Sequence, residues 1–201
     1  MAAHRAFDPR RVGALECAAW VGYYRREWLT VLRAAVLLTR HMFSLPWPAT
    51  AYGAWLVLRA NQLWAPRPRN DPEGARSAME RFYRLVARCH GESFDPARAA
   101  ALEVEWWRLH RAHQQDGPDI DRSRLIDALA ALYSYVYGVP EDEVRQAAEQ
   151  RVLAMDYSDR WVKAGCDPRS PLLAAERAAL VRSYAALLAA VHIPSVGPPG
   201  G

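Results

Sequence analysis

The sequence has one lysine, three cysteines and no long hydrophobic run, and each scarcity excludes a class of protein. Lys163 is the one lysine among 26 basic residues, so 25 are arginines. The arginines are interspersed with 22 acidic residues, whereas a nucleic-acid-binding face concentrates its basic groups. Nucleic acid is therefore a disfavoured partner. A GC-rich genome favours arginine codons, although arginine also suits stacking, anion contacts and buried ion pairs.

The three cysteines, Cys17, Cys89 and Cys166, lie far apart, and none belongs to a CxxC motif. They predict neither a disulfide framework nor a zinc site, and they suit a reducing compartment. The first eleven residues lack the apolar segment of a signal peptide. We therefore expect a cytoplasmic protein.

The longest stretch without a formal charge, residues 41–58, contains two prolines that would interrupt a membrane-spanning helix. Trp47, Trp55 and Trp64 are nevertheless of the residue type that anchors proteins at membrane interfaces. The segment Trp47–Trp64 thus predicts a peripheral contact with a membrane and not a span.

Several catalytic motifs are also missing. The sequence has no phosphate-binding GxxxxGK loop, no dinucleotide-binding GxGxxG and no GxSxG of a hydrolase. It also has no Glu-x-x-His, which a di-iron helical bundle needs twice. Enzymes built on these motifs are therefore disfavoured.

The signals that are present are those of helices. Asp-Pro pairs at residues 8, 71 and 95 and the Ser170-Pro171 pair are typical helix starts, and Gly91, Gly138 and Gly165 are typical helix ends. We predict an all-α protein, a single helical bundle of about seven helices within residues 1–193, followed by a disordered tail at 194–201. The expected helices are 9–43 with a break near Gly22, 48–64, 72–90, 96–114, 122–137, 141–164 and 171–191.

An internal echo runs through the chain. The segment from Phe7 to Trp20 matches the segment from Phe94 to Trp107 at eight of fourteen positions without a gap. A weaker echo, which needs an insertion of about five residues, links Trp64, Asp71-Pro72, Tyr83 and His90 to Trp161, Asp167-Pro168, Tyr184 and His192. Two origins stay open: duplication of units 7–90 and 94–192 with pseudo-twofold symmetry, or convergence on a common helix start.

The echo places acidic and aromatic residues on equivalent helix faces, because residues three and four apart share a face. Glu16 precedes Trp20 and Tyr23, and Glu103 precedes Trp107 and His110. If the two faces meet, Glu16, Glu103, His110 and also Glu27 would gather inside the bundle, and the first three are the candidate catalytic residues. Trp20, Tyr23, Trp107 and Arg111 would then be candidate ligand-binding residues. The alternative is that both carboxylates make structural ion pairs with neighbouring arginines.

One family resembles part of the chain. The order of Asp71-Pro72, His110-Arg111, a polar turn, Gly138-x-Pro140 and Asp167-Pro168 resembles the latex-clearing-protein-like oxygenases over about residues 56–184. That resemblance implies an all-helical fold and haem b. The family holds its haem through a Trp-Val-His element, where this chain has Ser123–Ala128 without histidine. Its haem would therefore be lost or would use His110.

These observations leave two functions open. The first is a helical binding or accessory protein whose aromatic-lined groove takes a hydrophobic small molecule, a lipid surface or a protein partner. The second is an oxygenase-type enzyme with haem or a metal as cofactor and its site on the Glu16, Glu103 and His110 faces.

Overall fold

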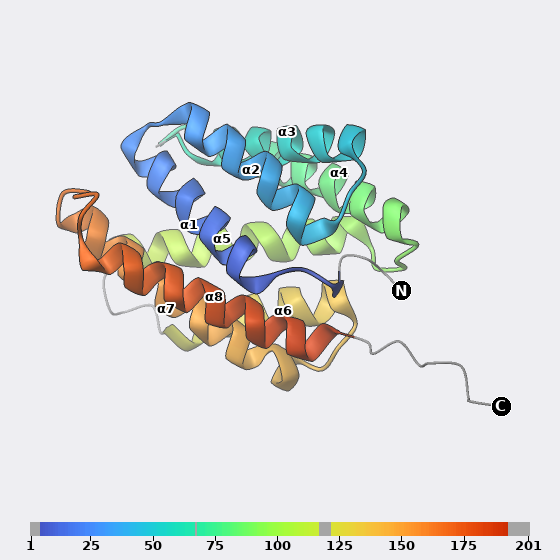
Figure 1. The fold of residues 1–201 in the computed structure, drawn as a ribbon. Coiled ribbons are helices and arrows are strands. Elements are labelled where there is room, and N and C mark those ends of the chain that lie inside the picture. The colour runs from blue at the N-terminus through green and yellow to red at the C-terminus, as the bar shows by residue number, and fades with distance from the viewer. Residues whose placement is uncertain (1–4, 67, 117–121, 193–201) are drawn as a thin grey trace.

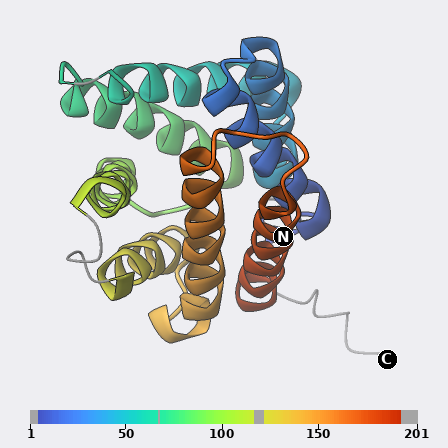
Figure 2. The same ribbon diagram turned by 90° about the vertical axis from the view of Figure 1, so that its left-hand side faces the viewer.

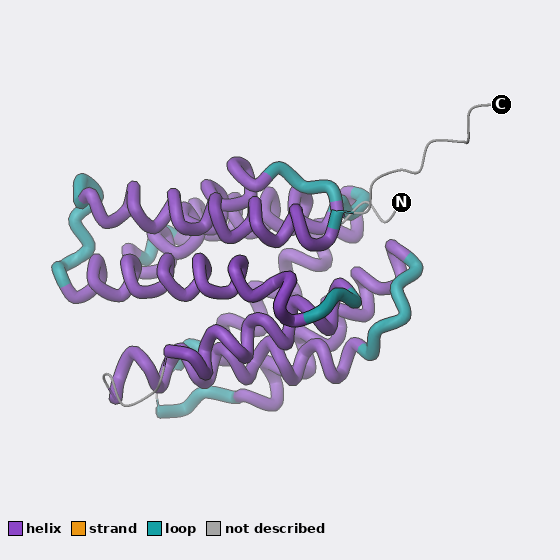
Figure 3. Tube along the Cα trace, turned by 90° about the horizontal axis from the view of Figure 1, so that it is seen from below, coloured by secondary structure: helices purple, strands orange, loops and turns teal. Residues whose placement is uncertain are grey.

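The computed structural model describes residues 5–66, 68–116 and 122–192. These ranges form eight α-helices, and Figure 3 shows only helices and loops among them. The helices are α1 (Pro9–Arg25), α2 (Trp28–Phe43), α3 (Trp47–Trp64), α4 (Pro72–His90), α5 (Pro96–Asp116), α6 (Arg122–Tyr137), α7 (Glu141–Lys163) and α8 (Pro171–Val191). The all-α bundle is confirmed, while the predicted tail at 194–201 lies outside the described residues.

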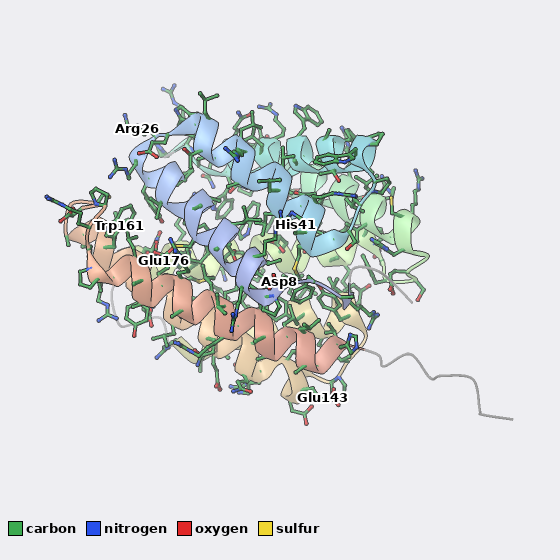
Figure 4. The ribbon with its side chains drawn as sticks, in the orientation of Figure 1. Asp8, Arg26, His41, Glu143, Trp161 and Glu176 are labelled. Carbon is green, nitrogen blue, oxygen red and sulfur yellow. The ribbon has the colours of Figure 1, made fainter. Side chains whose placement is uncertain are left out.

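The eighth helix arises because the predicted helix 9–43 is two helices. The break lies at Arg26, whose left-handed backbone (φ 59°) ends α1, and Figure 4 shows Arg26 at the corner between α1 and α2. Gly22, where we expected the break, is helical and buried. A Cβ atom on Gly22 would lie 3.1 Å from Val31 Cγ2, so this glycine lets α1 and α2 approach closely.

The predicted caps form as expected. Asp8 accepts a hydrogen bond from the Arg10 amide (2.9 Å), Asp71 from that of Gly74 (2.8 Å) and Asp95 from that of Ala97 (3.0 Å). Each proline that follows occupies the first helical position, where its missing N–H costs nothing. These short sequence signals therefore fix three of the helix starts.

The eight helices pack in a closed circuit. Each helix contacts the next one in the sequence, and α8 returns to α1. In Figure 1, α2–α4 lie above and α6–α8 below, with α1 and α5 between them, and Figure 2 shows the same layers from the side. Side chains from all eight helices therefore point toward a common interior. None of the helices in the described ranges is both long and apolar enough to cross a bilayer.

The junction of α1 and α8 depends on Gly13. A Cβ atom there would lie 2.9 Å from the Val181 amide nitrogen and 3.1 Å from the Leu180 carbonyl carbon, which are backbone atoms. We expect Gly13→Ala to lower the free energy of unfolding by about 1–3 kcal/mol, although alanine favours helices, because the two helices must move apart.

Gly22→Ala is the matched control for this substitution, since its nearest neighbours are side-chain atoms that can shift. We expect it to cost less than about 1 kcal/mol in urea denaturation. Equal costs for the two variants would contradict the close backbone contact between α1 and α8.

Candidate functional site

A cavity of about 440 Å³ lies inside the circuit of helices. All eight helices contribute to its wall, from Glu16 on α1 to Tyr184 on α8. The wall is mainly apolar and rich in aromatic rings, namely Trp20, Tyr23, Tyr24, Trp28, Phe43, Trp64, Phe82, Tyr83, Trp106, Trp107, Tyr133, Tyr137 and Tyr184. Its volume falls in the range of pockets that bind small molecules.

Glu16 forms a buried ion pair at one side of this cavity. Its side chain is 5% exposed and pairs with the Arg151 guanidinium from α7, which is 13% exposed. Arg151 Nη1 donates to Glu16 Oε2 at 3.2 Å, and the Tyr184 hydroxyl donates to the same oxygen at 2.6 Å. Burial raises the pKa of Tyr184, which keeps its hydroxyl a donor. The charge of Glu16 is therefore compensated within the protein.

Glu103 lines the same cavity from α5, but no cation of the described residues is bonded to it. The Tyr83 hydroxyl donates to Glu103 Oε2 at 2.7 Å, and Trp107 Nε1 donates to Oε1 at 3.1 Å. Burial raises the pKa of Glu103, while these hydrogen bonds and the charge of Arg151 oppose the rise. A carboxyl group in this setting can exchange a proton with a bound molecule.

The two carboxylates have matching surroundings. Glu16 on α1 bonds to Tyr184 on α8, and Glu103 on α5 bonds to Tyr83 on α4. The rings of Phe7 and Tyr184 meet edge to face at 5.9 Å, and those of Phe94 and Tyr83 at 6.1 Å. Both sets follow the correspondences of the internal echo.

The match extends to a second pair of contacts and then ends. Tyr24 meets Trp161 at 6.4 Å between ring centroids, and Arg111 lies over Trp64 at 4.2 Å. Trp64 and Trp161 correspond in the weaker echo, whereas Tyr24 and Arg111 lie beyond the matched segments, although the same spacing of 87 residues separates them. Arg151, however, bonds to Glu16 and not to Glu103. One of the two glutamates therefore has a cationic partner, and the other has neutral partners.

Polar atoms without a hydrogen bond gather around the cavity. Six residues in the described ranges have buried side-chain nitrogen or oxygen atoms with no hydrogen-bond partner, and all except Glu176 line the cavity. Of the five that line it, His110 has the Asp159 carboxylate 3.4 Å from its Nε2 atom, and the other four are Trp106, Tyr133, Arg151 and Ser158. Because buried polar groups are normally satisfied, these atoms indicate where a bound molecule or water would be held.

Three of these groups are close neighbours. The Arg151 guanidinium lies 5.5 Å from the centroid of the Trp106 ring. Arg151 also lowers the pKa of the nearby Tyr133 phenol, although burial dominates and raises it to about 12. The Arg151 Nε and Trp106 Nε1 groups can only donate, so this side of the cavity suits an acceptor atom.

The structure brings together all seven residues predicted as site residues, since each lines this cavity. Glu16, Glu103 and His110 lie in its wall, with Trp20, Trp107, Tyr23 and Arg111 beside them. Their catalytic and ligand-binding roles remain predictions. Glu27 was wrongly expected in the interior, because it lies beyond the end of α1, is exposed and pairs with Arg25 at 2.7 Å.

A wider surface groove between α4 and α5 is a weaker candidate. Four arginines line it, namely Arg76, Arg98, Arg108 and Arg111. Arg76 pairs with Glu73, Arg108 pairs with Glu105, and Arg98 lies over the Tyr135 ring. Arg111 donates to the Trp64 carbonyl oxygen at 2.8 Å. Each of the four described arginines of the groove therefore already has a partner.

The residues around the cavity do not fit a haem held by an axial histidine. His110 is the one histidine of the cavity wall in the described chain, and its Nε2 atom lies 3.4 Å from Asp159 Oδ2. Its ring also packs against Trp106, with 6.4 Å between centroids. The nitrogen that would bind iron is therefore directed at a carboxylate. No group of three or more His, Cys, Asp or Glu side chains within the described ranges could hold a metal ion.

No protein-family model, curated protein or solved structure matches this chain. The resemblance to the latex-clearing-protein-like oxygenases thus remains a prediction from Asp71-Pro72, His110-Arg111 and the later turns.

Proposed function

We propose that this protein binds a small hydrophobic molecule in the cavity enclosed by its eight helices. The observation that carries the proposal is an aromatic cavity of about 440 Å³ whose wall includes four residues with a buried polar atom outside any hydrogen bond, namely Trp106, Tyr133, Arg151 and Ser158. An apolar wall with a few convergent polar groups is the usual composition of a ligand site.

The polar groups favour a ligand with an uncharged oxygen acceptor, such as a ketone or ester carbonyl. Arg151 Nε and Trp106 Nε1 can only donate, and the Tyr133 hydroxyl can donate as well. The Glu16 and Arg151 charges compensate each other, so neither is a free countercharge for an ionic ligand. A neutral carbonyl oxygen needs no countercharge and can accept hydrogen bonds from these donors.

We also propose that the two halves of the chain, 7–90 and 94–192, arose by duplication. The exchanged Glu–Tyr bonds of α1 with α8 and of α5 with α4 support this origin, as do the paired Phe–Tyr contacts. In this view a twofold site became asymmetric when Arg151 was placed beside Glu16, which left Glu103 with neutral partners.

The carbonyl preference can be tested with a fluorescent ketone. Prodan is an uncharged naphthyl ketone whose emission shifts to the blue in apolar surroundings. We expect it to bind the wild-type protein, and we expect Tyr133→Phe to weaken this binding about fivefold, because one hydrogen bond contributes about 1 kcal/mol. The fold should be retained, since phenylalanine keeps the buried ring of Tyr133 and removes only its hydroxyl.

Two controls accompany this titration. Tyr157→Phe on α7 removes a hydroxyl from a residue outside the cavity wall and should leave prodan binding unchanged. N-Phenyl-1-naphthylamine, a probe without a carbonyl, should bind the wild-type and Tyr133→Phe proteins equally. Unchanged prodan affinity in Tyr133→Phe would refute the acceptor site beside Arg151.

A further inference from the structure

The large exposed hydrophobic side chains are confined to one part of the molecule. All seven in the described chain lie between residues 23 and 55, at the end of α1 and along α2 and α3. They are Tyr23, Trp28, Leu29, Leu32, Trp47, Tyr52 and Trp55, and Leu29 is 84% exposed. We call these residues the α2–α3 face. Such a concentration marks a surface that contacts something other than water.

The same segment carries the net charge of the chain. Residues 25–59 contain five arginines and a single acidic residue, Glu27, which Arg25 already pairs. The remaining basic and acidic residues of the chain are equal in number. Arg33 and Arg59 are exposed on α2 and α3, and the Arg40 guanidinium lies over the Trp47 ring at 5.2 Å. The α2–α3 face is therefore both apolar and positively charged.

We propose that the α2–α3 face binds the surface of an anionic lipid bilayer. Exposed tryptophan and tyrosine rings settle at the headgroup level of a bilayer, and the stacked pair Tyr52 and Trp55 (5.9 Å) offers such a platform. Arginines beside them are attracted by acidic headgroups. The helices would lie along the membrane without crossing it, in agreement with the finding that no helix among the described residues could span a bilayer.

This face adjoins the rim of the cavity. Tyr23 and Trp28 are both partly exposed and line the cavity, and their rings meet edge to face at 6.4 Å. A protein docked through this face would hold the rim against the bilayer, so a hydrophobic ligand could pass between lipid and cavity without crossing water. This last step rests on the proposed function, whereas docking itself does not.

Vesicle flotation tests the docking. We expect the full chain to float with vesicles of equimolar phosphatidylcholine and phosphatidylglycerol, and to float weakly with phosphatidylcholine alone. Leu29→Ser combined with Trp55→Ser should lower the partition coefficient about tenfold or more, because two exposed anchors are lost. Arg33→Gln combined with Arg59→Gln should lower it about tenfold on the anionic vesicles only.

The matched control removes the same charge elsewhere. Arg124→Gln combined with Arg169→Gln alters exposed arginines on α6 and in the turn before α8, and should leave flotation unchanged. Absence of flotation, or equal flotation of all variants, would overturn the proposal. The proposal would also be overturned if the protein did not bind vesicles but self-associated, and if the Leu29 and Trp55 substitutions abolished this self-association. The α2–α3 face would then bind a second copy of the chain. Prodan binding without vesicles is measured separately, so failure of docking and failure of the cavity are distinguishable.

Discussion

Replacing Arg151 by methionine is expected to lower the free energy of unfolding by about 3–5 kcal/mol. The substitution removes the cation from a buried pair and leaves the Glu16 carboxylate with only the Tyr184 hydroxyl as a donor. Methionine has a similar length and is apolar, so packing is largely kept. The decrease in the free energy of unfolding therefore measures the cost of leaving the Glu16 carboxylate without its cation. Urea denaturation near neutral pH measures the effect.

Two further variants make this prediction specific. Arg145→Met on the same helix removes an exposed arginine that pairs with Asp127 at 2.9 Å, and it should cost no more than about 1 kcal/mol. Glu16→Gln added to Arg151→Met should recover much of the loss, because no charge remains buried. If Arg151→Met and Arg145→Met were equally mild, Glu16 and Arg151 would not form a buried pair.

Glu176→Gln is expected to stabilise the protein, and only at high pH. Glu176 on α8 is fully buried, and its carboxyl group lies by the Cys17 thiol of α1. Figure 4 shows Glu176 beside α1. Burial, reinforced by the charge of Glu16, raises the pKa of Glu176 from 4.5 to about 7. The folded protein therefore binds a proton that the unfolded chain releases.

The sign of the effect follows from this linkage. Below the unfolded pKa both states are protonated, and Glu176 imposes no penalty. As the pH rises from 4.5 to about 7, folding stability falls by about 3 kcal/mol and then stays level. Glu176→Gln cannot ionise, so it should exceed the wild type by about 3 kcal/mol at about pH 8 and match it at about pH 4.

The exposed Glu149 on α7 provides the control for this titration. Glu149→Gln removes a carboxylate that pairs with Arg145 at the surface (3.8 Å), so its effect should be below about 1 kcal/mol at both pH values. A Glu176→Gln protein that is less stable than the wild type at about pH 8 would mean that Glu176 is ionised and paired in the folded state.

The sequence predicts much of the fold because interactions between residues close in the sequence determine several of its helix boundaries. Asp8, Asp71 and Asp95 act on amides two or three residues away, so no distant contact is needed to find these starts. The break between α1 and α2 was displaced to Arg26 for a tertiary reason. Gly22 lies where the two helices touch, and the left-handed turn falls four residues later, at Arg26.

Part of the site was also predictable, because helical periodicity places Glu16 with Trp20, and Glu103 with Trp107, on shared faces. Their meeting in one cavity required the closure of α8 onto α1, which no local pattern encodes. Tyr83 and Tyr184 appeared only as members of the weak echo, and their bonds to the glutamates follow from the packing of α4 and α8.

Arg151 was the main omission, although the sequence holds a signal for it. It lies in helical register with Val144, Ala148 and Met155, all of which are buried on α7. An arginine on an apolar stripe must find a buried anion, since an unpaired charge there is prohibitively costly. Arg151 was not singled out, because other charged residues of α7, such as Arg145 and Glu149, are exposed and lie close to it in the sequence.

The most direct test of the binding proposal is a prodan titration of the wild-type protein and of Ala35→Trp. Ala35 on α2 lines the cavity, so an indole ring there would occupy the space in which the ligand is expected. Ala178→Trp, on the exposed surface of α8, adds the same ring outside the cavity and serves as the control. We predict one blue-shifted prodan per chain in the wild type and in Ala178→Trp, and none in a folded Ala35→Trp. Equal binding by all three proteins would contradict a ligand site inside the bundle.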